Sequence, residues 1–357
     1  MSTTIDLLER CTTKEENKEE YLFQSPPLLE IKDLSITLHG ANGQKEKNVV
    51  KKLNLKIRPG EMLGLAGESG SGKSLTASAI LGLLPKSLNV SEGQIEFRGK
   101  DLARLSEKEM RCVRGKEIAY LFQNYQGSFT PFIKIGKQLV EALRSHEKIR
   151  KADARKKALI WLERVKVPAE RIFNSYPHQL SGGQLQRASL AAALMFKPPL
   201  IIADEPTTAL DVLTGEKILD LLADLQKELN CAILLISHDL KHVLKRTDSM
   251  VVMYGGQIVE KGLTKNIETN PLHPYTKMLL QARPVLTQTV PEKLVAIPGE
   301  PGLVAERGCS FALRCPKSLE KCSIVPEMQS EEDSHWTACH NLVAEGENTN
   351  ASSQKCL

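Results

Sequence analysis

Residues 67–76 read GESGSGKSLT, and this stretch decides the fold. It follows the apolar run EMLGLA (61–66) and precedes SLTASAILGLL (74–84), whose apolar residues recur at helical spacing. The pattern Gly67-x4-Gly72-Lys73-Ser74 is typical of a phosphate-binding loop between a strand and a helix. Its glycines let backbone N–H groups turn inward, and the helix N-terminus adds positive charge. The stretch predicts a nucleotide-binding α/β protein.

Two side chains of this loop have distinct expected tasks. Lys73 would bring a point charge to the β- and γ-phosphate oxygens, and the Ser74 hydroxyl would be a ligand of Mg²⁺. The residues that we expect to contact the nucleotide here are Gly67, Glu68, Ser69, Gly70, Ser71, Gly72, Lys73, Ser74 and Leu75.

A second stretch, YPHQLSGGQLQRASLAAALMF (176–196), opens another helix with glycines. A helix N-terminus of this kind offers backbone donors to an anion, so we expect contacts from four residues. They are Ser181, Gly182, Gly183 and Gln184.

The apolar run LIIADEP (200–206) has the composition of a buried strand and ends in Asp204 and Glu205. A carboxylate at a strand end beside the phosphate loop suits Mg²⁺, and a neighbouring carboxylate can polarise an attacking water. Strand-like and helix-like runs alternate from there to about residue 262, which predicts a largely parallel sheet.

Together these stretches resemble the nucleotide-binding subunits of ABC transporters, in which LSGGQ (180–184) is the signature motif. The resemblance covers about residues 28–265 and implies an α/β P-loop NTPase core with a parallel sheet, an antiparallel β subdomain and a helical subdomain. It implies that ATP and Mg²⁺ are the cofactors. Gln123 in LFQN would contact Mg²⁺ or water, Asp211 in TALD would belong to the D-loop, and His238 in ISHD would contact the γ-phosphate.

The resemblance also implies a mechanism that needs two ATPase subunits. Each ATP would lie between the phosphate loop of one subunit and the Ser181–Gln184 segment of the other, and we expect the two subunits to be different chains. Hydrolysis would then release them. The catalytic residues on this interpretation are Glu205, His238, Gln123 and Lys73.

Two segments depart from the family pattern. The loop HGANGQKEKN (39–48) contains no aromatic residue to stack on adenine, unless His39 serves. Residues 124–131 read NYQGSFTP, whereas the peptide-transporter subgroup commonly has a sequence closer to DPMTSLNP. We expect this second segment to face the membrane subunits.

Beyond residue 265 the stretches NPLHPYTKMLLQA, IPGEPG and GCSFALRCPKSLEKC resemble the extension of the oligopeptide, dipeptide and nickel importers. This extension favours peptide import over export, with nickel, metallophore or opine import as the alternative. A soluble ABC ATPase acting on ribosomes or DNA is disfavoured because the chain has one cassette without long insertions. The expected divisions are a mobile leader (1–26), the ATPase domain (27–265, with a helical subdomain at about 101–190), the extension (266–342) and a disordered tail (343–357).

The extension also holds Cys309, Cys315, Cys322 and Cys339. Thiolates on Pro- and Gly-rich loops can close around a metal, and the absence of a C-x2-C knuckle favours [4Fe–4S] over zinc. A mixed zinc site with His335 or His340, and four unligated thiols, remain alternatives.

Charge and hydropathy limit the partners. The formal net charge is +5, and no Lys/Arg run is dense enough to propose nucleic acid binding. No run approaches the roughly 18 apolar residues of a membrane-spanning helix. We therefore expect a peripheral protein on the cytoplasmic side of the cell membrane. It would reach the membrane through two transmembrane permease subunits, and an extracytoplasmic solute-binding protein would deliver the cargo.

Overall fold

The computed structural model describes residues 25–40, 46–282, 296–332 and 334–341. Nearly all of the predicted leader, and the predicted tail at 343–357, lie outside these residues. No helix in the described part of the chain combines the length and the apolar character needed to span a bilayer.

The first sheet is antiparallel and has the strand order β2-β1-β4-β5. Buried and exposed side chains alternate along the second half of β2, as expected where one face is covered, whereas residues 34–37 of β1 are all buried. Its strands are β1 (Leu29–Leu38), β2 (Lys47–Ile57), β4 (Leu88–Phe97) and β5 (Lys100–Asp101).

The main sheet has eight strands in the order β11-β12-β10-β9-β3-β8-β7-β6. Its pairs from β9 to β6 are parallel, and every residue of β3, β7 and β8 is buried, as expected where helices cover both faces. The strands are β3 (Met62–Ala66), β6 (Ile118–Leu121), β7 (Leu200–Asp204), β8 (Ala232–Ser237), β9 (Ser249–Tyr254), β10 (Gln257–Leu263), β11 (Gln329–Glu332) and β12 (His335–Thr337).

The register of the parallel strands brings the motifs of the sequence to one edge. Ala66 lies opposite Ser237, and Asp204 lies opposite Ile236. The carboxyl ends of β3, β7 and β8 therefore meet, and the segments that follow them share that edge.

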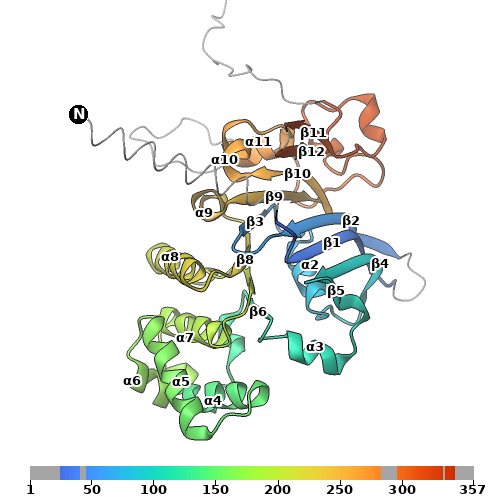
Figure 1. The fold of residues 1–357 in the computed structure, drawn as a ribbon. Coiled ribbons are helices and arrows are strands. Elements are labelled where there is room, and N and C mark those ends of the chain that lie inside the picture. Colours follow the sequence, from blue (N-terminus) through green and yellow to red (C-terminus); the bar gives the residue numbers. More distant parts are fainter. Residues whose placement is uncertain (1–24, 41–45, 283–295, 333, 342–357) are drawn as a thin grey trace, which may run out of the picture.

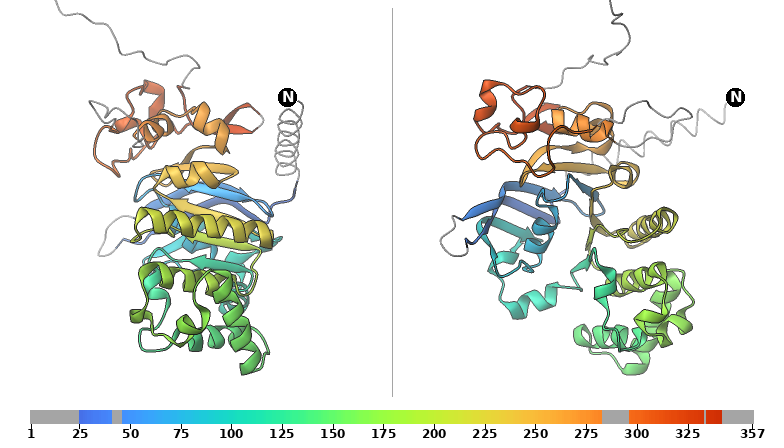
Figure 2. Two further views of the ribbon diagram at one scale, coloured as in Figure 1. Left: turned by 90° about the vertical axis from the view of Figure 1, so that its left-hand side faces the viewer. Right: turned by 180° about the vertical axis from the view of Figure 1, so that it is seen from behind.

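Helices α4 to α7 form a helical lobe at one end of the molecule, and the C-terminal extension lies at the opposite end (Figure 1). The two turned views of Figure 2 also show the helical lobe and the extension on opposite sides of the sheets. The helices are α2 (Lys73–Ile80), α3 (Glu107–Val113), α4 (Ile135–His146), α5 (Lys151–Arg164), α6 (Ala169–Asn174), α7 (Gly182–Leu194), α8 (Val212–Leu229), α9 (Leu240–Arg246), α10 (Thr264–Thr269) and α11 (Pro274–Gln281). Short 3₁₀ turns are η1 (Leu102–Arg104), η2 (Tyr125–Ser128), η3 (Pro177–Gln179), η4 (Ala312–Arg314) and η5 (Glu320–Ser323).

Strand β6 lies inside the range 101–190 predicted to be helical but is an edge strand of the main sheet. Strands β11 and β12, which the sequence pattern did not predict, continue that sheet from β10 into the extension. The rings of Tyr254, Tyr275 and Phe311 pack together with centroids 4.8 to 5.2 Å apart. The extension thus shares both a sheet and a core with the nucleotide-binding part.

Candidate active site

The phosphate loop has a backbone that only glycines adopt easily. Gly67, Gly70 and Gly72 have φ values of 147°, 78° and 102°. A Cβ at Gly67 would lie 2.3 Å from the carbonyl oxygen of Met253, so a larger residue there would clash with the neighbouring strand. The sequence therefore specifies the loop conformation directly.

Lys73 lies inside this loop and is only 5% exposed. Its Nζ donates to the carbonyl oxygens of Gly67 (2.8 Å) and Glu68 (2.9 Å). Burial lowers the pKa of Lys73, while the carboxylates of Glu205, Asp204 and Glu68 act in the opposite direction. The ammonium group is thus held beside the inward-facing backbone, where it can meet phosphate oxygens.

The oxygen atoms expected to bind magnesium lie together. Ser74 Oγ donates to one oxygen of Asp204 at 3.0 Å, and Tyr120 Oη donates to the other at 2.8 Å. Burial raises the pKa of Asp204. A hydroxyl and a carboxylate are oxygen ligands of the kind that Mg²⁺ prefers, so Ser74 and Asp204 fit this ion.

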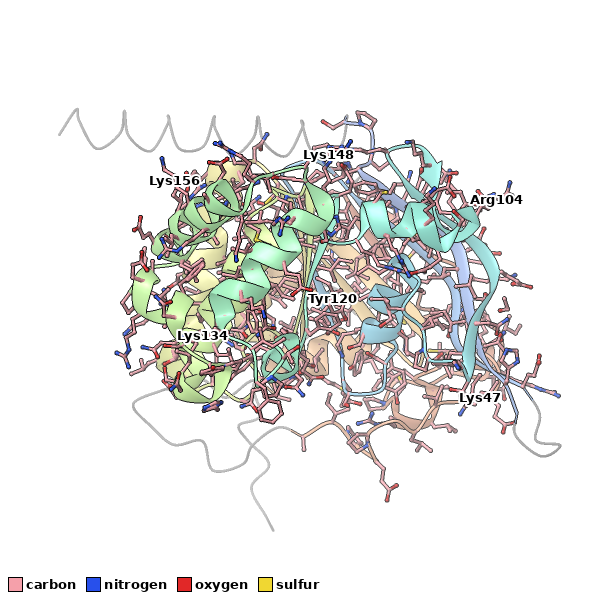
Figure 3. All side chains as sticks on the ribbon, turned by 90° about the horizontal axis from the view of Figure 1, so that it is seen from below. Lys47, Arg104, Tyr120, Lys134, Lys148 and Lys156 are labelled. Atoms are coloured by element: carbon pink, nitrogen blue, oxygen red, sulfur yellow. The ribbon has the colours of Figure 1, made fainter. Side chains whose placement is uncertain are left out.

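Tyr120 was missed in the sequence analysis. It lies in β6, between the helical lobe and the four-stranded sheet (Figure 3). The available signal was a hydroxyl-bearing residue three positions before Gln123, within an apolar run. Burial, and next the charge of Asp204, raise the pKa of Tyr120, so the phenol stays protonated and donates.

Glu205 follows Asp204 with a left-handed backbone, φ 47°. Its carboxylate accepts from Gln123 Nε2 at 2.9 Å and from Thr208 Oγ1 at 3.1 Å. His238 Nδ1 lies 3.0 Å from its other oxygen. The structure therefore brings Gln123, Glu205 and His238 into direct contact, and Thr208 is an additional partner that the sequence did not indicate.

The Ser181–Gln184 segment lies elsewhere. Ser181 caps α7: its Oγ accepts from the N–H of Gln184 at 3.4 Å, and the Gln184 side chain accepts from the N–H of Ser181 at 3.2 Å. A Cβ built at Gly182 would meet Tyr125 Oη at 2.7 Å, and one at Gly183 would meet Thr214 at 2.8 Å. The close neighbours of these glycines thus lie outside the phosphate loop of the same chain.

Asp211 caps α8 by accepting from the N–H of Thr214 at 2.9 Å. Hydrogen bonds from the Thr214 hydroxyl and N–H lower its pKa. A cavity of about 300 Å³ is lined by Glu205, Asp211 and His238 among others. Asp211 therefore caps α8 and shares a cavity with the catalytic candidates Glu205 and His238.

Comparison with known proteins identifies the family. The family model described as "ABC transporter" matches residues 50–208, and the model described as "Oligopeptide/dipeptide transporter, C-terminal region" matches residues 259–322. The oligopeptide transport ATP-binding protein OppD of Bacillus subtilis (strain 168) is 45% identical over 314 residues, which cover 87% of each chain. OppD of Escherichia coli (strain K12) is 40% identical over 325 residues, covering 90% of this chain and 95% of the relative. The chain belongs to the ABC transporter ATP-binding proteins.

Solved structures agree with this assignment. The dimeric ATP-binding cassette MJ0796 in a post-hydrolysis state, bound to ADP and Pi, has a TM-score of 0.59 and 29% identity, covering 66% of this chain and 98% of that one. CbiO1 from Clostridium perfringens has a TM-score of 0.59 and 26% identity, covering 68% and 91%. The predicted ABC-type α/β fold and ATPase activity are thereby confirmed. The chain is an ABC ATPase that uses ATP.

His39, the residue of the loop 39–48 that the sequence offers for stacking on adenine, is half-exposed, and its Nδ1 lies 3.4 Å from Glu46 Oε1. A cavity of about 140 Å³ lies between the phosphate loop and the extension, lined by Glu68, Tyr254 and Val304 among others.

The four cysteines of the extension are free thiols, three of them buried. Burial raises the pKa of Cys309, Cys315 and Cys339, that of Cys339 to about 11, and the other thiols of the set add to each rise. His335 Nε2 instead pairs with Glu260 at 2.7 Å. Among the described residues, no group of three or more His, Cys, Asp and Glu side chains is arranged to hold a metal ion.

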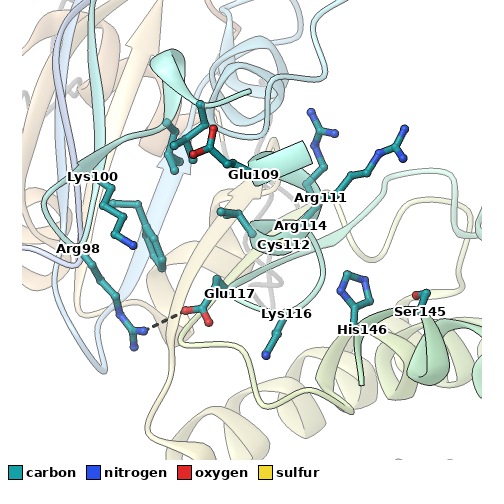
Figure 4. Close-up of a pocket in the computed structure, with 14 residues that line it drawn as sticks. Arg98, Lys100, Glu109, Arg111, Cys112, Arg114, Lys116, Glu117, Ser145 and His146 are labelled. Carbon is teal, nitrogen blue, oxygen red and sulfur yellow. Dashed lines mark hydrogen bonds and ion pairs between the residues drawn. The ribbon is translucent and has the colours of Figure 1, made fainter. Parts of the chain in front are cut away.

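A separate cavity of about 1130 Å³ contains none of the predicted site residues (Figure 4). Its wall combines apolar side chains with basic ones from α3 and the segments on either side of it, and Arg98 forms an ion pair with Glu117 at 3.0 Å. The basic residues on its wall are Arg98, Lys100, Arg111, Arg114 and Lys116.

Proposed function

We propose that this ABC ATPase powers the import of oligopeptides or dipeptides. The observation that carries the proposal is the match of residues 259–322 to the C-terminal region of oligopeptide and dipeptide transporters. Relatives named as oligopeptide transport proteins, which span most of the chain, support it. The chain would work at the cytoplasmic face of the cell membrane with two permease subunits, a second ATPase subunit of different sequence and an extracytoplasmic binding protein.

Exposed aromatic side chains support a permease contact around the segment 124–131. Phe122 is 48% exposed and Phe132 is 86% exposed, and they flank this segment on both sides. Apolar side chains of this size are usually covered in a working assembly. Gln123, which contacts Glu205, lies directly beside Phe122, so permease movement at this surface would reach the catalytic carboxylate.

Within the ATPase pair, each ATP would lie between one chain's phosphate loop and the other chain's Ser181–Gln184 segment. The nearest neighbours of Gly182 and Gly183, which are Tyr125, Leu210 and Thr214 and not residues of the phosphate loop, support contact between chains. A crosslinking experiment tests this. This chain carrying Ser69→Cys should crosslink, with ATP present, to a partner ATPase subunit that has a cysteine at the serine of its own signature motif. In a chain that carries both Ser69→Cys and Ser181→Cys, a crosslink within that one chain would contradict the arrangement.

In hydrolysis, water oxygen bonds to the γ-phosphorus while the bond to the β–γ bridging oxygen breaks, which gives ADP and phosphate. Glu205 would take up or orient the water proton, with Gln123 and His238 fixing its carboxylate. When bound at Ser74 and Asp204, Mg²⁺ would neutralise phosphate charge.

Glu205→Gln tests this assignment and is the largest change expected. It removes the proton acceptor while keeping the side-chain shape, so ATP hydrolysis by the assembled transporter should fall about 10³-fold. ATP retention, measured by filter binding, should persist. Glu141→Gln, at an exposed position on α4, is the matched control. Hydrolysis by Glu205→Gln at the wild-type rate would contradict the role.

We also propose that the four extension thiols take up a [4Fe–4S] cluster, with zinc as the alternative. Their soft donor atoms, and a spacing that lacks the C-x2-C knuckle usual for zinc, support the proposal. Because no group of three or more such side chains among the described residues is arranged to hold a metal ion, loading would require these cysteines to rearrange. Iron, sulfide and zinc analysis of protein purified without oxygen decides: zinc alone, or no metal, overturns the proposal.

A further inference from the structure

The extension reaches into the phosphate loop through one arginine. Arg314, at the end of η4, donates from Nη1 to Glu68 Oε2 at 2.7 Å and from Nη2 to Glu68 Oε1 at 3.1 Å. The Arg314 side chain is 1% exposed, and that of Glu68 is 17% exposed. A two-pronged, buried contact of this kind fixes both position and orientation of the carboxylate.

A second residue of the extension holds the backbone of Glu68. The Glu68 N–H donates to Tyr275 Oη at 2.9 Å, and Tyr275 is fully buried in α11. The Glu68 carbonyl oxygen accepts from Lys73 Nζ at 2.9 Å and from the Ser71 N–H at 3.3 Å. The backbone of Glu68 therefore connects the extension, through its N–H, to the lysine expected to meet phosphate, through its carbonyl oxygen.

Arg314 cannot easily follow Glu68 if the loop moves, because it is anchored elsewhere. Its Nε donates to the carbonyl oxygen of Pro298 at 2.7 Å, and its Nη1 lies 3.2 Å from Tyr254 Oη in β9. The guanidinium group is thus fixed to the extension and to the main sheet before it meets the loop.

The ion pair also has an electrostatic consequence for nucleotide binding. The negative charge of Glu68 is one of those that raise the pKa of Lys73. Glu68 therefore also lies close enough to repel a triphosphate bound beside Lys73. A half-buried carboxylate without a partner would repel this polyanion and would compete for Lys73. Arg314 cancels that charge.

From these contacts we infer that Arg314 and Tyr275 are positioning residues of the ATP site, so that the extension sets the shape and charge of the phosphate loop. This inference is independent of the solute that the transporter carries. ATP affinity, and not the rate at saturating ATP, is then the property that depends on the extension.

Arg314→Met in the full-length chain tests the inference. It leaves Glu68 buried without its partner, so the Kd for ATP should rise about tenfold, with kcat at saturating ATP within about threefold of wild type. Adding Glu68→Gln removes the uncompensated charge, so the double variant should bind ATP within about threefold of wild type. Fluorescent-nucleotide titration and ATPase assays of the assembled transporter measure both quantities.

Controls separate positioning from general stability. Arg246 is also buried and pairs with Glu216 and Asp220 on α8, so Arg246→Met should lower Tm without changing the Kd for ATP. Tyr275→Phe keeps the ring in the core, removes the acceptor of the Glu68 N–H and should raise the Kd about threefold. This variant and the double variant decide the matter even where Arg314→Met does not fold. A wild-type Kd in Arg314→Met or Tyr275→Phe overturns the inference, as does a double variant that binds ATP tenfold more weakly than wild type.

Discussion

Helices α2 and α7 both begin in glycine-rich segments, but only α7 has a side-chain cap for the N–H groups of its first turn. Helix α2 follows Gly72, which provides no side-chain cap, and the loop before it turns its backbone inward through glycines with positive φ. Helix α7 is capped by Ser181, whose partner Gln184 completes a reciprocal pair of hydrogen bonds. The first turn of α2 keeps donors for a ligand, whereas α7 satisfies part of its own turn.

The pKa values of Asp204 and Asp211, one from each region, are shifted in opposite directions. Burial raises the pKa of Asp204, next to the phosphate loop, so its negative charge is costly until a cation arrives. Hydrogen bonds from Thr214 lower the pKa of Asp211, near the α7 region, so its charge is already stabilised by its own helix. One half of the ATP site is prepared for a ligand at a cost in stability, and the other half is stable alone.

The largest effect that this contrast predicts is on ATP binding by a single chain. Lys73→Ala removes the buried ammonium group from the phosphate loop and should raise the Kd for ATP by about 100-fold. Ser181→Ala should change the Kd of the unpaired chain less than twofold, because its segment has no part in that half of the site. Nucleotide titration of the purified chain measures both.

Lys108→Ala, at an exposed position on α3, controls for the loss of a positive charge. In the assembled transporter Ser181→Ala should become visible as weaker ATP-dependent pairing of the two ATPase subunits. Equal losses for Lys73→Ala and Ser181→Ala in the unpaired chain would remove the contrast between the two regions.

A smaller effect concerns stability without metal. The folded state raises the pKa of Asp204 above its unfolded value. Its contribution to the free energy of unfolding is therefore fully present below the unfolded pKa and is lost as pH rises through the folded pKa. Asp204→Asn has no carboxylate to ionise, so it keeps this stability at neutral pH, and its amide can still hydrogen bond to Ser74 and Tyr120. In EDTA at pH 7.5 its Tm should exceed that of wild type by roughly 2–4 °C, although hydrolysis with Mg²⁺ should be lost.

Thermal melts from pH 7.5 downward provide the check, since the advantage of Asp204→Asn should shrink as pH falls toward 4. Excess Mg²⁺ should reduce it as well, because the ion stabilises the wild-type carboxylate and not the amide. A variant less stable than wild type in EDTA at pH 7.5 would show that the carboxylate carries no penalty.

The sequence predicted those parts of the site that follow directly from the ends of parallel strands. Lys73, Asp204 and His238 each come shortly after a buried apolar run, and such runs meet at one edge in a parallel sheet. The structure places these residues together with Ser74, Gln123 and Glu205, and their catalytic roles stay predictions. Gly67 and Gly72 were recognisable because the loop needs positive φ at those positions.

Other features depend on contacts that no local pattern shows. Strand β6 has four residues and lies between helical segments, so its run was too short to separate from them. Strand β12 has three residues and pairs with β10, and the charged strand β11 pairs in turn with β12. Arg314 and Glu68 are 246 positions apart, and FALRC was used only as a mark of the subgroup. Long-range partners of this kind become visible only in the folded chain.

The smallest expected effect is at Asp211, and its sign is opposite to that at Asp204. Here the folded state lowers the pKa, so the stabilising contribution is present above the unfolded pKa and is lost as pH falls through the folded value. Asp211→Ala removes the cap of α8 and should lower Tm at pH 7.5 by roughly 1–3 °C, with the deficit narrowing only as the pH falls below the ordinary aspartate pKa of 3.8. Asp211→Asn keeps the cap geometry and should fall between Asp211→Ala and wild type. Measured in the same buffers, the two aspartates should therefore approach wild type from opposite sides as pH falls. Two variants that both lose stability at pH 7.5 would mean that the phosphate-loop half and the D-loop half are equally satisfied without ligand.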